Sequence, residues 1–292
     1  MSQTTSQIMK STIKILYILS PLLLVSLFSC RKDKAIEPYK INHYIHLSHT
    51  RTSTNPHMDS LVELIDYSKY DMLWLGGDLS YLTSLDNNTM THIDSIFDIG
   101  NKKTLWALGN HYYTDINRIQ QFTNRPAYYS TYHNKITLII LDTQDSLSNI
   151  VGSQRDFLIE ILDTIQVSTH LIILHHKLIW MYNNNQIENL SSSIPNTGIG
   201  DCFHCINPNN FNSEIYPKLV DIKKKGIEIL CIGGDIGFKS KEFQHLTPEG
   251  IYFIASGIGN GNKNNKALLF THDITNNNLT WDFTLTSDLL KK

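Results

Sequence analysis

Short apolar runs, each ending in a polar or glycine-rich segment, constrain the fold of this 292-residue chain more than any other feature. The runs are rich in Ile, Leu and Val and are bounded by Gly, Asn, Asp or His, as strands buried on both faces usually are. They cover residues 44–47, 72–75, 104–108, 136–141, 171–174, 227–232, 251–255 and 267–270. Amphipathic stretches separate several of them, and this alternation predicts an α/β domain with no internal boundary after about residue 40.

Three of the intervening stretches have helical periodicity, with apolar residues recurring at i, i+3 and i+4. They cover residues 58–65, 157–165 and 215–222, and the third ends in three lysines and Gly226, which is typical of a helix C-terminus. Residues 251–283 contain strands without helical spacers. We expect them to form the antiparallel edge of a second sheet.

The N-terminus has the pattern of an export signal. Lys10 and Lys14 precede an apolar run at residues 15–28, which is too short and too interrupted to span a membrane comfortably. Leu27, Phe28 and Ser29 lead into Cys30 and resemble a bacterial lipobox. We therefore expect a lipoprotein signal peptide at 1–29, lipidation at Cys30, a tether at 30–40 and a folded domain at 41–292. An ordinary signal peptide or an uncleaved anchor are the alternatives.

A lipidated Cys30 would tether the domain to a membrane of the cell envelope, facing the periplasm or the exterior. In such a compartment, Cys202 and Cys205, in a C-x-x-C pattern, could form a local disulfide. A zinc knuckle would need a second pair of ligands. Charged residues make up only 18% of the chain and the net charge is -2, so we expect no nucleic-acid partner.

Residues that can bind a metal or a phosphate follow five of the apolar runs. They include His49 and Arg51, Asp78, Asn110 and His111, His175 and His176, and Asp235, with glycines beside most of them. Ligands of α/β sheets gather at the carboxyl ends of parallel strands. One such residue is usually a cap or a surface group, but five in series indicate a metal or phosphate site.

These strand ends resemble the five motifs of the calcineurin-like metallophosphoesterases, D-x-H, G-D, G-N-H, H and G-H-x-H. Gly109-Asn110-His111 matches the third motif, Gly77-Asp78 the second and His175 the fourth, over a resemblance that covers residues 41–272. It implies a four-layer α/β/β/α sandwich of two mixed sheets. It also implies a metal-dependent hydrolase of phosphate mono- or diesters.

Two motifs depart from the family pattern. His49-Thr50-Arg51 stands where D-x-H is expected, and Gly234-Asp235-Ile236-Gly237 stands where G-H-x-H is expected. Arg is protonated at ordinary pH and Gly has no side chain, so the metal site that would use Arg51 and Gly237 is lost or rebuilt. The resemblance implies that the other site survives with Asp78, Asn110, His175 and Asp235 as ligands to one divalent ion, Mn, Fe or Zn.

By the same resemblance, His111 is the general acid of this predicted site. Arg51 and His49 would stabilise developing charge, and His176 would support the ligands. The alternative is a buried salt-bridge cluster of Asp78, Asp235 and Arg51 without metal, in a catalytically inactive binding module that captures a ligand or a protein partner. Hydrolysis of a non-phosphate ester is a third interpretation.

Overall fold

The computed structural model describes residues 40–112 and 114–291. The predicted signal peptide, Cys30 and residues 30–39 of the predicted tether lie outside the described residues. In the part of the chain that the structure describes, no helix has both the length and the apolar character needed to cross a membrane. The lipid anchor and the domain limit at residue 41 therefore stay predictions.

The first of two mixed sheets has five strands in the order β11-β10-β1-β2-β3. Three parallel strands follow one another from its centre to one edge, and two antiparallel strands complete the other side. Their bounds are β1 (Ile41–Leu47), β2 (Met72–Leu75), β3 (Thr104–Trp106), β10 (Lys266–Asp273) and β11 (Asn278–Leu285).

The second sheet has six strands in the order β4-β5-β6-β7-β9-β8. Its four central strands are parallel, and both edge strands run antiparallel to their neighbours. The bounds are β4 (Tyr129–His133), β5 (Ile136–Ile140), β6 (His170–Leu174), β7 (Glu228–Gly233), β8 (Glu242–Leu246) and β9 (Tyr252–Ser256).

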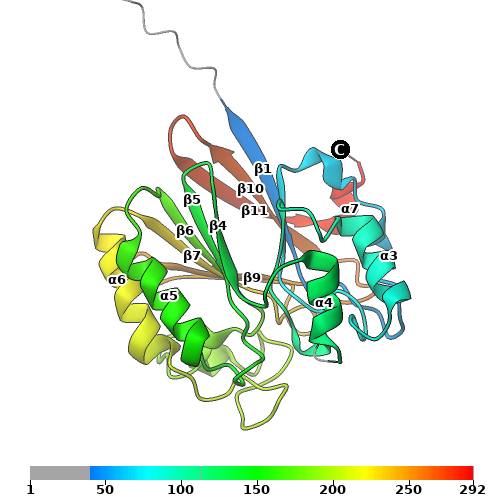
Figure 1. The fold of residues 1–292 in the computed structure, drawn as a ribbon, viewed down its shortest axis with the longest axis horizontal. Coiled ribbons are helices and arrows are strands. Elements are labelled where there is room, and N and C mark those ends of the chain that lie inside the picture. The colour runs from blue at the N-terminus through cyan, green and yellow to red at the C-terminus, as the bar shows by residue number, and fades with distance from the viewer. Residues whose placement is uncertain (1–39, 113, 292) are drawn as a thin grey trace, which may run out of the picture. The chain divides into compact units, whose positions relative to one another are not determined.

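Helices cover the outer face of each sheet (Figure 1). The five-stranded sheet carries α2 (Ser60–Glu63), α3 (Asn87–Phe97), α4 (Ile116–Thr123) and α7 (Thr286–Leu289), and the six-stranded sheet carries α5 (Gly152–Thr164) and α6 (Tyr216–Lys224). Shorter turns are η1 (Tyr67–Lys69), η2 (Asn110–Tyr112), η3 (Ile179–Met181), η4 (Glu188–Leu190) and the π-helical η5 (Phe211–Ile215). This arrangement confirms the predicted four-layer α/β/β/α sandwich.

A third apolar layer joins the inner faces of the two sheets. Trp74, which is fully buried, lies at its centre, with its ring 5.1 Å from that of Tyr44 and 4.6 Å from that of Phe270. Burying a large side chain contributes about 1.5–3 kcal/mol, so this layer holds the sheets together. It also fixes which strand ends face one another at the edge of the sandwich.

The observed elements correct three details of the sequence prediction. The helix expected at 58–65 is the four-residue α2, since Asp59 caps its start and Leu64 N–H already bonds back to Leu61 O. Residues 251–283 do not form one antiparallel edge, because β9 lies parallel to β7 while β10 and β11 belong to the five-stranded sheet. Strands β4 and β8 were not predicted, and their partly exposed, polar sequences explain why.

Candidate functional site

Loops from both sheets meet at the carboxyl ends of the parallel strands. They follow β1, β2 and β3 in one sheet, and β6 and β7 in the other. Hydrogen bonds cross between the groups, among them Ser48 Oγ donating to Gly234 O at 2.6 Å and His176 Nδ1 donating to Gly76 O at 2.7 Å. The polar strand ends noted in the sequence therefore lie at one edge of the sandwich.

The Asp78 carboxylate is surrounded by basic groups. Its Oδ2 atom lies 3.6 Å from His176 Nε2, 3.8 Å from His111 Nε2, and 4.0 Å from both His49 Nε2 and Arg51 Nε. Burial by itself would raise the pKa of Asp78, but the neighbouring histidines, His176 first, outweigh it and hold the pKa below its usual value. Asp78 is therefore ionised at neutral pH although it is buried.

Several residues at and near this carboxylate have positive φ angles. Asp78 and His49 both have φ of 53°, in the left-handed region, and Gly77 has φ of 102°. A Cβ atom on Gly77 would lie 2.4 Å from His176 Nδ1, so only glycine lets the chain pass so close to that ring. Strained conformations of this kind often gather at functional sites.

His176 turns a ring nitrogen towards two carboxylates. Because a carbonyl oxygen can only accept, the bond to Gly76 O makes Nδ1 a donor, and Nε2 is the ring nitrogen that faces the carboxylates. Nε2 is buried and has no hydrogen-bond partner among the described residues, and it lies 3.6 Å from Asp78 Oδ2 and 4.0 Å from Asp235 Oδ1. This is the arrangement of a ligating histidine held by its other nitrogen.

His175 points elsewhere. Its Nδ1 donates to Lys177 O at 2.7 Å, and its ring lies beside the backbone of Gly233. Burial lowers the pKa of His175 to about 4, so the ring is neutral at pH 7. The structure thus brings His176, and not the predicted ligand His175, to Asp78 and Asp235; a ligand role for either stays a prediction.

Two loop residues orient the Asp235 carboxylate. Asn196 Nδ2 donates to its Oδ1 at 3.0 Å, and Thr197 Oγ1 donates to its Oδ2 at 3.3 Å. Both come from the long segment between β6 and α6, and no motif in the sequence pointed to them. Only the folded loop shows that they hold Asp235 facing His176.

Arg51 and His49 fill the position next to Asp78 on the side of the five-stranded sheet. His49 Nδ1 donates to Ile258 O at 3.0 Å, and its Nε2 accepts from Arg51 Nε at 3.2 Å. The Arg51 guanidinium also lies 5.3 Å from the centre of the Phe238 ring, a cation–π distance. These two contacts engage both ring nitrogens of His49. Burial lowers the pKa of His49 to about 4, and Asp78 offsets this only in part.

Gly237, where the family pattern has its last histidine, leaves no room for a side chain. It has φ of 133°, and a Cβ atom there would lie 2.3 Å from Ile258 O. A histidine at this position would require the backbone to move, because the obstructing atom belongs to the main chain.

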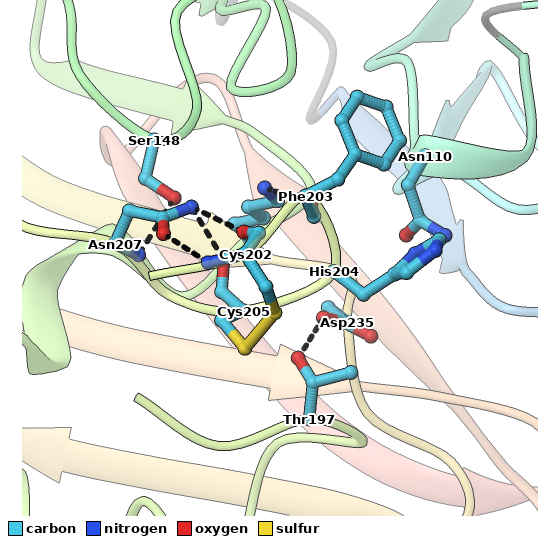
Figure 2. Close-up of a disulfide and its surroundings, with 10 residues drawn as sticks. Asn110, Ser148, Thr197, Cys202, Phe203, His204, Cys205, Asn207 and Asp235 are labelled. Atoms are coloured by element: carbon cyan, nitrogen blue, oxygen red, sulfur yellow. Dashed lines mark hydrogen bonds between the residues drawn. A yellow bond between two sulfur atoms is a disulfide. The ribbon is translucent and has the colours of Figure 1, made fainter. Parts of the chain in front are cut away.

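A disulfide-closed turn borders the site beside Asn110. Cys202 and Cys205 are joined, and Asn110 Nδ2 donates to Nδ1 of His204, which lies between them, at 3.0 Å (Figure 2). The Asn207 side chain fixes the turn by donating to the carbonyl oxygens of both cysteines. A local disulfide was one prediction for this C-x-x-C, but no sequence motif pointed to a contact between His204 and Asn110.

Two more basic groups complete the surroundings. Lys177 is fully buried, and its Nζ donates to Phe203 O in the disulfide turn at 2.7 Å. Burial lowers the pKa of Lys177 to about 8, although nearby carboxylates, Asp235 first, act in the opposite direction. His111 Nδ1 donates to Tyr81 O at 2.5 Å, and its Nε2 lies 3.8 Å from Asp78 Oδ2. Burial lowers the pKa of His111 as well, partly offset by Asp78.

Replacement of Gly237 by Ala should lower the free energy of unfolding by about 1–3 kcal/mol, since an L side chain is strained at this φ and meets Ile258 O. Gly198→Ala is the control, because a Cβ there meets nothing within 4 Å. Urea unfolding of the two variants tests this. Equal midpoints would show that the space at Gly237 is not restricted.

The double variant Cys202→Ser, Cys205→Ser should free the turn that carries His204. For so short a loop, we expect a loss of about 2 kcal/mol at most in unfolding free energy, and faster amide exchange at residues 198–206 but not in the central strands. Reductant should produce the same change in the unmodified chain and none in the variant. Unchanged exchange at 198–206 in both would show that the disulfide does not hold the turn.

No protein-family model matches the chain, and no curated protein matches it. Among solved structures, it is similar to a dimetal phosphatase from Danio rerio, with 10% identity, a TM-score of 0.47, and coverage of 84% of this chain and 96% of that one. It is also similar to a Haemophilus influenzae NAD nucleotidase (11%, TM-score 0.43) and a Thermus thermophilus 5'-nucleotidase precursor (12%, TM-score 0.39). It spans only 50% and 58% of the latter two chains. All three similarities are distant, and the named activities are those of the other proteins.

Proposed function

We propose that the chain is a phosphoesterase that hydrolyses phosphate mono- or diesters with one divalent ion held between Asp78, His176 and Asp235. The observation that carries the proposal is the buried, unpaired Nε2 of His176 facing oxygens of two carboxylates. A buried polar atom without a partner is costly, and a metal ion would satisfy it. His176 thus takes the ligand role that the sequence motif suggested for His175.

These donors suit a borderline divalent ion. One imidazole nitrogen with two carboxylates favours Mn, Fe or Zn over Ca. Asn196 and Thr197 would orient Asp235 for binding, and Gly76 O would orient His176. Asn110 extends the site towards His204. When bound, the ion would polarise a phosphoryl oxygen and lower the pKa of a water molecule.

Basic side chains around the site would bind and orient a phosphate group. Arg51, held by His49 and Phe238, presents a planar cation of the kind that binds two phosphate oxygens at once. His111 would exchange a proton with the leaving oxygen, the role that the resemblance gives to this residue. Lys177 and the disulfide turn would close the opposite side.

The contacts at the family's second metal position, near Arg51 and Gly237, support a single ion. There Arg51 supplies a fixed positive charge, His49 has no free nitrogen, and Gly237 cannot carry a ligand. The alternative of an inactive binding module is supported by Arg51, whose fixed positive charge already lies beside Asp78.

The variant Asp78→Asn should retain its fold and lose one equivalent of Mn, Fe or Zn, and hydrolysis of bis-para-nitrophenyl phosphate should fall at least about 100-fold. His176→Gln should behave in the same way and His175→Gln should not. Asp221→Asn, an exposed change on α6, is the control.

Circular dichroism, metal analysis and turnover distinguish the outcomes. Loss of metal in His175→Gln instead of His176→Gln would return the ligand role to His175. Equal metal content in the unmodified chain and Asp78→Asn, with no turnover in either, would refute the enzyme and favour the binding module.

We also propose that Cys30 is lipidated and anchors the chain to the cell envelope. Cys30→Ser should abolish incorporation of labelled fatty acid and move the protein out of the membrane fraction. Ser29→Ala keeps a small residue before the cysteine and should remain lipidated. Label in Cys30→Ser would contradict the proposal.

A further inference from the structure

Three side chains that belong to none of the five motifs lie close together on the helix-covered side of the five-stranded sheet. His57 lies in the loop between β1 and α2, Glu63 at the end of α2, and His92 in the middle of α3. Glu63 Oε1 lies 2.9 Å from His92 Nε2 and 3.6 Å from His57 Nδ1. The three ligand atoms all lie within 4.8 Å of one another.

These separations are close to those of a tetrahedral metal site. Zinc bonds of about 2.0–2.1 Å to nitrogen and oxygen at tetrahedral angles place neighbouring ligand atoms about 3.3 Å apart. The Glu63 distances of 2.9 and 3.6 Å lie on either side of that value. The His57 ring has room to rotate towards the other two ligand atoms, because its side chain is 63% exposed.

The carboxylate and the loop are held in place before any ion binds. Glu63 Oε1 accepts from Met58 N–H at 2.7 Å, which fixes its direction. The loop is anchored by Asn55, whose side chain bonds both Leu82 N and Leu82 O, and by a bridge between Met58 and Arg51. Glu63 and the loop backbone would therefore lose little conformational entropy when the three side chains bind one ion.

We propose that His57 Nδ1, Glu63 and His92 Nε2 form a second divalent metal site, of the zinc class, with an open fourth position. Two imidazoles and one carboxylate suit Zn and, in the usual order of affinity, Cu, Ni and Co. Metal binding would replace the hydrogen bond between His92 Nε2 and Glu63 Oε1. The site shares no residue with the one around Asp78, so it stands whether or not the chain is a phosphoesterase.

Zinc alone, titrated into the full chain carrying Asp78→Asn, tests the site without a contribution from Asp78. We expect one equivalent to bind, and the affinity to fall at least about 10-fold in His92→Gln and in Glu63→Gln, which lie on different helices. His43→Gln, an exposed histidine on β1, should leave the affinity unchanged. Cobalt bound in place of zinc should show the visible absorption that is typical of a low coordination number.

Two results would overturn the proposal. One is the absence of zinc binding in the Asp78→Asn chain. The other is an affinity that neither His92→Gln nor Glu63→Gln changes, with both variants folded by circular dichroism. Loss of phosphoesterase activity plays no part in either readout, so failure of this site and failure of the proposed function can be told apart.

Discussion

The buried negative charge of Asp78 is the constraint around which the loops of both sheets are arranged. An isolated buried carboxylate costs several kcal/mol, so the structure places the charged Arg51 beside it, together with the rings of three histidines. Each partner is in turn fixed by a main-chain carbonyl or by an aromatic ring. Removing the charge from Asp78 would therefore change the role of every one of these groups.

The positions of the buried strands, and the meeting of their polar ends at one edge, were largely predictable, because buried parallel strands are read from short apolar runs and their carboxyl ends collect ligands. The choice between His175 and His176 was not. Adjacent side chains at a strand end point to opposite sides, and only the register of β6 against its neighbours decides which one faces Asp78.

Long-range loop contacts were equally hidden from the sequence. Asn196 and Thr197 reach Asp235 across 39 and 38 positions of the chain, and His204 reaches Asn110 across 94. Polar loop residues of these types are common and carry no periodicity. The cluster of His57, Glu63 and His92 was missed for the same reason, since it joins a loop and two helices that no motif connects.

Closure of the disulfide turn depends on the redox conditions in which the chain folds. A thiol-reducing cytosol keeps cysteines apart, whereas an oxidising compartment joins them. Until Cys202 and Cys205 are joined, the segment that sets His204 beside Asn110 lacks its covalent closure. In a reducing compartment, the strand ends around Asp78 would thus be in place, but the turn that carries His204 would lack its covalent link.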